Sequence, residues 1–409
     1  MAVGLKRMLA AGLLALCGPL WAAQKVDLDY HVQLLPQSDQ AEVRLTLARG
    51  SAVRSLDFDL GDGSRYSHFK ADGQWRLIPG KQTRGVWRPS ADKASLTYRV
   101  RVSQARKNGT FETRMSPGWA LLRGDDLVPS ARLDQQDGVE LVSRLQFELP
   151  AGWKSIETPW PRIGKQRFRI DNPERLFDRP TGWMLAGKLG SRRTRLGETE
   201  VTVASPQGQG MRRMDVLTLL TFVWPQVQAL VPRHPGKLLI IGASDPMWRG
   251  AQAGHESIYL HSRPALVSER GNSPMLRELV QMLVRVKDRE RSDWISEGLA
   301  EYYAIELLRR AGGMSDERYQ ALNDRLARDS KGVTTLRGEQ IGTATQAKAV
   351  LLLQELDREI RLKTRNKRSL DDVLQAAMRL ETVDTEEFVQ LSESVLGESS
   401  TVLDSKLLQ

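Results

Sequence analysis

The sequence predicts a multidomain α+β protein with a strand-rich N-terminal half and a helical C-terminal part. Three observations carry this prediction. Up to about residue 204 apolar residues tend to recur at every second position, as in half-buried strands, and from about residue 211 they recur with the period of a helix. The third is the length, because 409 residues are enough for two or three domains.

The first 23 residues have the pattern of a secretory signal peptide. Lys6 and Arg7 precede an apolar run over residues 8–17, and small residues follow at Ala22 and Ala23, where we expect cleavage. A buried N-terminal helix and a lipid anchor on Cys17 are the alternatives. We therefore expect a periplasmic or secreted protein whose mature chain has neither a cysteine nor a transmembrane segment.

The charge of the chain is moderately basic. It has 60 Lys and Arg residues against 50 Asp and Glu, a formal net charge of +10. This excess does not require a nucleic-acid partner, and we expect none, because no phosphate-binding loop or nucleic-acid module is present. The densest basic segment, residues 361–368, predicts either a solvated helix end or a contact with an acidic partner or anionic lipid.

Strands are expected first along the chain. Residues 26–34, 41–47 and 95–102 alternate apolar and polar residues, and glycine-containing turns follow at 61–63, 107–109 and 150–152. Short strands separated by turns of this kind favour a β-sandwich over residues 24–204.

The second half predicts two short buried strands, 237–241 and 258–260, among helices. Helices are expected over 275–286, 293–310 and 315–329 of a unit spanning 205–330, and over 345–362, 369–380 and 385–396 of a helical domain spanning 331–409. Ser369 and Thr385 are the expected N-caps of the last two helices.

Two of these helices bring polar residues together. Arg277 and Gln281 are one turn apart on the first, with Glu278 beside them, and Glu297 and Glu301 are one turn apart on the second. The sequence therefore predicts a polar cluster between two consecutive helices.

These helices resemble those of the glutamate-zincin (gluzincin) metallopeptidases, most closely the glycyl aminopeptidase family. In that family one helix carries H-E-x-x-H, with two zinc-binding histidines and a glutamate base, and the next helix supplies a glutamate as third ligand. The second-helix motif is matched here by Trp294, Glu297, Gly298, Ala300 and Tyr302. The resemblance implies a thermolysin-like α/β peptidase unit between the sandwich and the helical tail.

The metal ligands of that family are largely absent. Glu278 is retained as a remnant general base, but Arg277 and Gln281 stand where the two histidines are expected. Arginine has no acceptor lone pair and stays protonated, so it cannot bind zinc. Only Glu297 remains of three ligands, and the histidines at 31, 68, 234, 255 and 261 lie on neither helix.

A positive hypothesis follows from this replacement. The Arg277 guanidinium is expected to lie where the zinc would be and to pair with Glu297, Glu278 or both, with Gln281 completing the hydrogen bonds. The alternative is that Arg277, Gln281 and Arg285 form an ordinary solvated stripe.

Further cleft residues follow from the resemblance. Residues 257–260 fall where the substrate-binding edge strand is expected, and Glu256 is then a candidate relic of the glutamate that grips a free amine, or else a surface-loop residue. Thr345 falls where the family has a transition-state tyrosine. Glu301 and Tyr302 are the remaining cleft candidates.

The sequence thus favours a pseudopeptidase that binds a peptide or protein partner in an inherited cleft, with no cofactor. One alternative is an active hydrolase with an atypical zinc site, with His255 and His261 as unforeseen ligands, or without a metal. Another alternative is a structural envelope protein.

Overall fold

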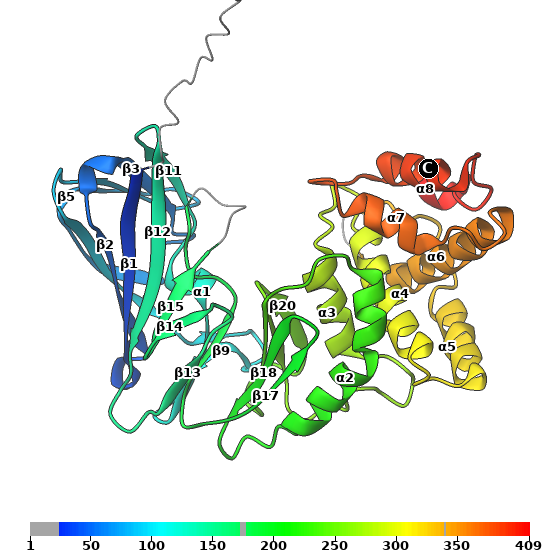
Figure 1. The fold of residues 1–409 in the computed structure, drawn as a ribbon, viewed down its shortest axis with the longest axis horizontal. Helices are drawn as coiled ribbons and strands as arrows, with labels where there is room; N and C mark the ends of the chain where they lie inside the picture. Colours follow the sequence, from blue (N-terminus) through cyan, green and yellow to red (C-terminus); the bar gives the residue numbers. More distant parts are fainter. Residues whose placement is uncertain (1–23, 172–176, 339–340) are drawn as a thin grey trace, which may run out of the picture.

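The computed structural model describes residues 24–171, 177–338 and 341–409, and the expected signal peptide lies outside these residues. Within them the fold is α+β, with several sheets in the N-terminal half and helices in the C-terminal part (Figure 1), as predicted. None of the helices described there is long and apolar enough to cross a membrane.

Three sheets share one core in the N-terminal half. The first has the order β14-β15-β12-β1-β2-β7-β4, the second β13-β16-β10-β9-β8 and the third β11-β3-β6-β5. Their strands are β1 (Gln24–Leu35), β2 (Gln40–Leu47), β3 (Val53–Asp59), β4 (Tyr66–Ala71), β5 (Gly73–Ile78), β6 (Arg84–Pro89), β7 (Ala94–Arg101), β8 (Gln104–Ala105), β9 (Phe111–Met115), β10 (Trp119–Arg123), β11 (Ala131–Gln135), β12 (Val139–Glu148), β13 (Ser155–Glu157), β14 (Arg162–Gly164), β15 (Arg167–Ile170) and β16 (Trp183–Gly187), with the short helix α1 (Gly124–Leu127) after β10. The alternation along β1 points Leu28, Tyr30 and Val32 into this core.

A fourth sheet belongs to the second half, in the order β17-β18-β19-β21-β20. Its strands are β17 (Leu189–Leu196), β18 (Thr199–Pro206), β19 (Lys237–Ile241), β20 (Ala251–Gly254) and β21 (Ser257–Leu260). This sheet begins at Leu189, earlier than the boundary expected after residue 204, because the β17–β18 hairpin pairs with β19. Periodicity could not detect the change of sheet, since both sides of it are strands.

The edge strand of this sheet is also displaced from its expected place. Residues 257–260 form β21, which is paired on both sides and entirely buried. The edge strand is β20, which joins β21 through the two-residue turn His255–Glu256. The prediction that 257–260 is the edge strand is therefore wrong, and residues 251–254 take that position.

Helices complete the second half and pack with the fourth sheet around a second core. They are α2 (Arg213–Leu230), α3 (Pro274–Val284), α4 (Trp294–Arg310), α5 (Asp316–Asp329), α6 (Thr343–Lys363), α7 (Leu370–Ala377) and α8 (Thr385–Leu396). Ser369 caps α7 as predicted. Thr385 does not cap α8: Asp384 does, in a capping box with Glu387, and Thr385 is buried against Ser292 and Trp294.

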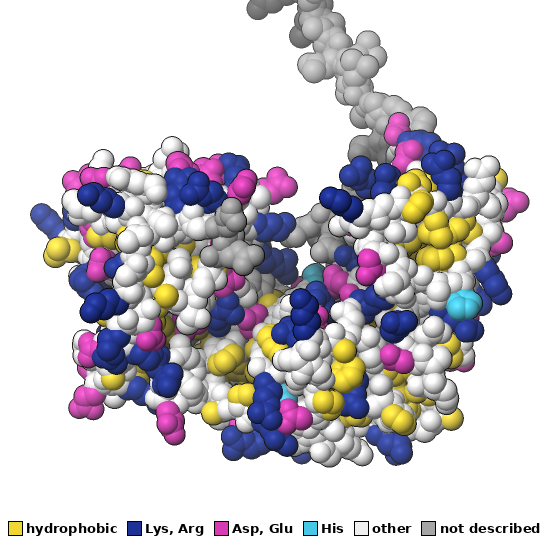
Figure 2. Space-filling model, turned by 180° about the vertical axis from the view of Figure 1, so that it is seen from behind, with side chains coloured by type: hydrophobic (Ala, Val, Ile, Leu, Met, Phe, Trp, Pro, Cys, Tyr) yellow, Lys and Arg dark blue, Asp and Glu magenta, His cyan; other side chains and the backbone are white. Residues whose placement is uncertain are grey.

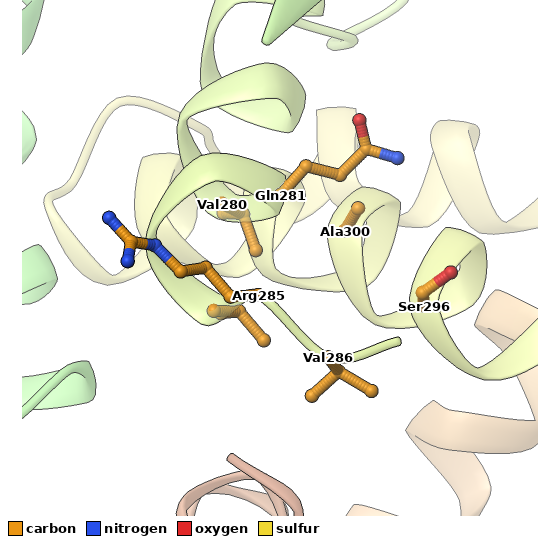
Figure 3. A pocket seen from close by; sticks show the side chains of 7 residues that line it. Val280, Gln281, Arg285, Val286, Ser296 and Ala300 are labelled. Carbon is orange, nitrogen blue, oxygen red and sulfur yellow. The ribbon is translucent and has the colours of Figure 1, made fainter. Parts of the chain in front are cut away.

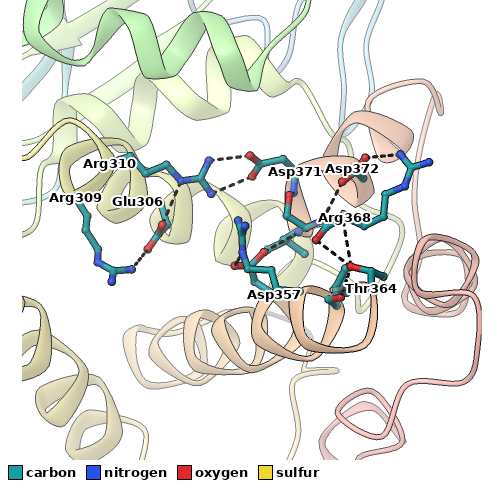
Figure 4. A network of polar contacts seen from close by, with 12 residues as sticks. Glu306, Arg309, Arg310, Asp357, Thr364, Arg368, Asp371 and Asp372 are labelled. Carbon is teal, nitrogen blue, oxygen red and sulfur yellow. Dashed lines mark hydrogen bonds and ion pairs between the residues drawn. The ribbon is translucent and has the colours of Figure 1, made fainter. Parts of the chain in front are cut away.

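An ion pair fixes α7 against α4 (Figure 4). Arg310 of α4 binds Asp371 of α7 through two nitrogens, at 2.8 and 3.1 Å, and the Tyr303 hydroxyl donates to the same carboxylate. In the basic segment, three of the five cations are paired within the chain: Arg361 with Asp357, Lys363 with Glu359 and Glu398, and Arg368 with Asp372. These contacts favour the solvated helix end over a partner contact for residues 361–368.

The surface carries both signs of charge. In Figure 2 the molecule has two parts with a notch between them. Lys and Arg side chains are spread over both parts and interspersed with Asp and Glu. This face has no continuous basic stripe of the kind that follows a nucleic-acid backbone.

Candidate functional site

Helices α3 and α4 present the predicted polar cluster. Ser273 caps α3 by accepting from the Leu276 N–H, and Pro274 occupies the first helical position. Leu276, Leu279 and other apolar residues of α3 are buried in the core. Arg277 and Gln281 therefore face α4 from the opposite side of the helix.

The guanidinium of Arg277 is the centre of the cluster. Its Nη1 lies 2.7 Å from Glu278 Oε1, its Nη2 donates to Glu297 Oε2, and its Nε is 3.9 Å from Glu301 Oε2. Although burial lowers the pKa of Arg277, the carboxylates of Glu297 and Glu278 outweigh burial and raise it. Arg277 was expected to pair with Glu297, Glu278 or both, and it contacts both, so it is not part of a merely solvated stripe.

Glu278 is the most buried carboxylate of the cluster, with 5% of its surface exposed. Oε1 accepts from Arg277, and Oε2 accepts from the backbone N–H of Ala253, 2.7 Å away on β20. Burial raises the pKa of Glu278, against the lowering effects of Arg277 and of the Ala253 N–H. Both oxygens of this carboxylate thus accept a hydrogen bond from the protein.

Glu297 is held by side chains from two other helices, α3 and α6. Gln281 Nε2 donates to Glu297 Oε1 at 3.0 Å, as predicted, and Gln346 Nε2 of α6 lies 3.4 Å from Oε2 and from the main-chain oxygen. Sequence reasoning missed Gln346, because no motif marks it. Thr345, its neighbour on α6, stays a prediction as a cleft residue.

The two remaining cleft candidates on α4 have different environments. Glu301 faces Arg277 and accepts from the Asn272 amide, whose oxygen in turn accepts from Arg325 at 2.7 Å. Tyr302, only 2% exposed, packs edge-on against Tyr303. Tyr302 is therefore a core residue, and its prediction as a cleft residue is wrong: it lies on the buried face of α4.

Glu256 lies in the β20–β21 turn beside the end of α3. Its carboxylate is 4.0 Å from Arg285, and burial raises the pKa of Glu256, opposed by Arg285 and Lys237. Of the two nearby histidines, His255 stacks on Trp160 at 4.5 Å and His261 is buried 3.4 Å from Asp245. Both histidines thus have other neighbours and do not join the Arg277 cluster.

The loop between α3 and α4 orients the first turn of α4. Asp288 accepts from the Ser296 N–H at 3.1 Å and from the Ser296 hydroxyl. Burial raises the pKa of Asp288 to about 6, although the two hydrogen bonds from Ser296 act against the rise. Since Ser296 precedes Glu297, this contact helps to position the cluster.

A pocket of about 200 Å³ lies next to the cluster (Figure 3). Gln281, which donates to Glu297, lines this pocket together with Ser296 and Ala300 of α4. The remaining lining residues are Val280, Val284, Arg285 and Val286. The pocket is smaller than a typical drug-sized site and suits one side chain or a similar fragment.

The residues present do not fit a zinc ion. Among the described residues, no group of three or more His, Cys, Asp or Glu side chains is arranged to hold a metal. At the position that the gluzincin pattern implies, a permanent cation already contacts Glu278 and Glu297, and it would repel Zn²⁺.

Comparison with known proteins shows which proteins share this fold. No protein-family model matches the chain, and no curated protein matches it in sequence. Solved structures match along nearly its whole length. An aminopeptidase N family protein of Idiomarina loihiensis has a TM-score of 0.66 at 14% identity, over 91% of this chain and 71% of that one.

Two further structures are similar. An M1 zinc metallopeptidase of Deinococcus radiodurans, in a mutant bound to a Tyr-Ser-Ala substrate, has a TM-score of 0.60 at 16% identity and covers 94% of this chain and 93% of its own. Leukotriene A4 hydrolase of Saccharomyces cerevisiae has a TM-score of 0.57 at 15% identity, over 94% and 66%. The chain therefore has the fold of the M1 zinc aminopeptidases, which are gluzincins, as the sequence resemblance implied.

Proposed function

We propose that this protein is a pseudopeptidase: it binds an extended peptide in an aminopeptidase-type cleft and does not cleave it. The observation that carries the proposal is the contact of the Arg277 guanidinium with both Glu278 and Glu297. The Arg277 side chain, which cannot bind zinc, thus pairs with both Glu297, the remaining ligand position, and Glu278, the base position. Hydrolysis by the zinc mechanism would need three ligands and a free base.

Peptide binding is supported by the position of β20 at the end of its sheet. His261 N–H donates to Gly250 O at 2.9 Å, so Gly250 and, by alternation, Gln252 and Gly254 bond towards β21. The backbone groups of Ala251 and Ala253 then point away from β21, to the side where Glu278 of α3 contacts Ala253. An extended peptide can add to such an edge as a further strand, with main-chain hydrogen bonds supplying affinity. The neighbouring pocket offers space for one of its side chains.

The test is a titration with the tripeptide Tyr-Ser-Ala, followed by calorimetry, with product analysis after prolonged incubation. We expect saturable binding without hydrolysis, with or without added zinc. Stoichiometric zinc together with chelator-sensitive release of tyrosine would overturn the proposal in favour of an active hydrolase. Absence of any binding would favour a purely structural protein.

A pair of variants at one position locates the peptide. Ala251→Pro removes an N–H that points away from β21, and edge strands tolerate proline. Ala251→Gly keeps this N–H and serves as the matched control. We expect Ala251→Pro to weaken tripeptide binding about tenfold and Ala251→Gly to change it little, at similar melting temperatures.

The proposal includes export of the protein. The basic residues, apolar run and small residues at the N-terminus support a cleaved leader. N-terminal sequencing of the exported protein is expected to begin at Ala23 or Gln24. An intact N-terminus on protein isolated from the periplasm would contradict cleavage at this place.

A further inference from the structure

The edge of β20 is partly occupied by the protein itself. Of the outward backbone groups of this strand, the Ala253 N–H already has a partner, Glu278 Oε2 at 2.7 Å. This partner is a side chain from α3 and not a neighbouring strand. A peptide that adds to β20 needs the same N–H, because main-chain donors along an edge are the groups that an added strand pairs with.

The Glu278 carboxylate is also held through its second oxygen. Oε1 accepts from Arg277 Nη1 at 2.7 Å, and the side chain is almost completely buried. The carboxylate therefore bridges the guanidinium and the edge strand, and each contact involves a charged group. Hydrogen bonds of this kind contribute more than neutral ones.

We propose that Glu278 is an internal competitor of the bound peptide: its carboxylate holds the Ala253 N–H, and a peptide strand pairs fully with β20 only after Glu278 has turned away. This inference rests on the proposed function, since it describes how peptide access to the same cleft is restricted. It assigns Glu278 a positioning and gating role in place of the general-base role that the sequence pattern implies.

The competition between Glu278 and a bound peptide is tested with Glu278→Ala, which removes the carboxylate and leaves the β20 backbone intact. We expect its affinity for Tyr-Ser-Ala to be about tenfold higher than that of the wild type, the equivalent of one charge-assisted hydrogen bond. Glu278→Gln keeps the size of the side chain with a neutral, weaker acceptor, and we expect a smaller gain. Equal or lower affinity of Glu278→Ala would overturn the inference.

Glu393→Ala is the matched control. The Glu393 carboxylate likewise accepts a main-chain N–H, from Ser400 at 3.1 Å, but it lies on α8 and not at β20. Its removal is expected to leave tripeptide affinity within about threefold of the wild type. A gain equal to that of Glu278→Ala would mean that general loosening, and not release of Ala253, raises affinity.

A second measurement tests the contact of Glu278 with the Ala253 N–H independently of the proposed peptide binding. Amide hydrogen exchange of Ala253, followed by NMR without peptide, is expected to be at least tenfold faster in Glu278→Ala than in the wild type. An unchanged exchange rate of Ala253 would overturn the inference, whatever the tripeptide affinities of the variants are. Faster exchange with no tripeptide binding in any variant would support the contact and overturn the proposed function alone.

Discussion

Replacement of Arg277 by methionine tests the central feature of the site. Methionine fills much of the volume of the aliphatic stem but supplies no charge and no donor. Glu278 then loses its partner on Oε1, and Glu297 Oε2 keeps the neutral amide of Gln346 but loses its cationic partner. Glu278 is 5% exposed, so its carboxylate then lies desolvated with only the Ala253 N–H to stabilise it. We expect a substantial loss of folding stability.

The magnitude follows from burial. Removing one partner of a fully buried ion pair costs about 3–5 kcal/mol. The Arg277 and Glu297 side chains are each 26% exposed, so water recovers part of this loss, and we expect about 2–3 kcal/mol. If the second half unfolds as one unit, the melting temperature should fall by about 5–10 °C.

Arg285→Met is the matched control, because Arg285 directly follows α3 as its C-cap but is 46% exposed and 4.0 Å from the carboxylate of Glu256. An exposed pair of this kind contributes about 0–1 kcal/mol. Thermal unfolding followed by circular dichroism at pH 7 compares the two variants with the wild type. The reasoning is refuted if Arg277→Met melts with the wild type or loses no more than Arg285→Met.

Three further predictions concern the same helices. The double variant R277H/Q281H is expected to bind about one zinc per chain by metal analysis, because both replaced side chains already reach Glu297; no more zinc than in the wild type would show that the geometry does not converge. The pKa of Asp288 is raised from 3.8 to about 6, so the ionised form is disfavoured in the fold and stability falls as the pH rises through roughly 4 to 6. Asp288→Asn keeps an acceptor for Ser296 and should remove a decrease of up to about 3 kcal/mol over this range, measured by urea unfolding; an identical pH profile would contradict the assignment. In Arg277→Met the stability deficit is expected to shrink when the pH is lowered from 7 to about 4.5, because stranded carboxylates can then take up protons; a constant deficit would mean that lost packing dominates.

Much of the secondary structure is local and was predictable. The strand over 237–241 and the helices around Arg277 and Glu297 occur close to the expected bounds, because apolar periodicity reports directly on which face is buried. Errors arose where several local solutions were possible. Thr385 and Asp384 are both acceptable N-caps, and only the buried contacts of Thr385 decide for Asp384.

Errors of a second kind concern placement between elements. Tyr302 fits the motif of a peptidase helix, yet its face of α4 packs into the core. Residues 257–260 read as an apolar strand, but nothing in that stretch states which neighbouring strand lies at the edge. The contact of Gln346 with Glu297 joins residues 49 apart in the sequence, and periodicity carries no information on such a contact.

The sequence by itself determined the fold class and the chemistry available at the centre. The resemblance to the gluzincins implies that Arg277 and Gln281 stand at the places of two histidines, and an arginine cannot bind zinc in any fold. Only the tertiary structure decided what these residues do instead. The packing of α3 against α4 and β20 brings the Arg277 guanidinium to Glu297 and the Glu278 carboxylate to the Ala253 N–H. These contacts span 20 and 25 residues of sequence, and hydrogen bonds depend on distances of a few tenths of an ångström that only the packed helices and sheet can set.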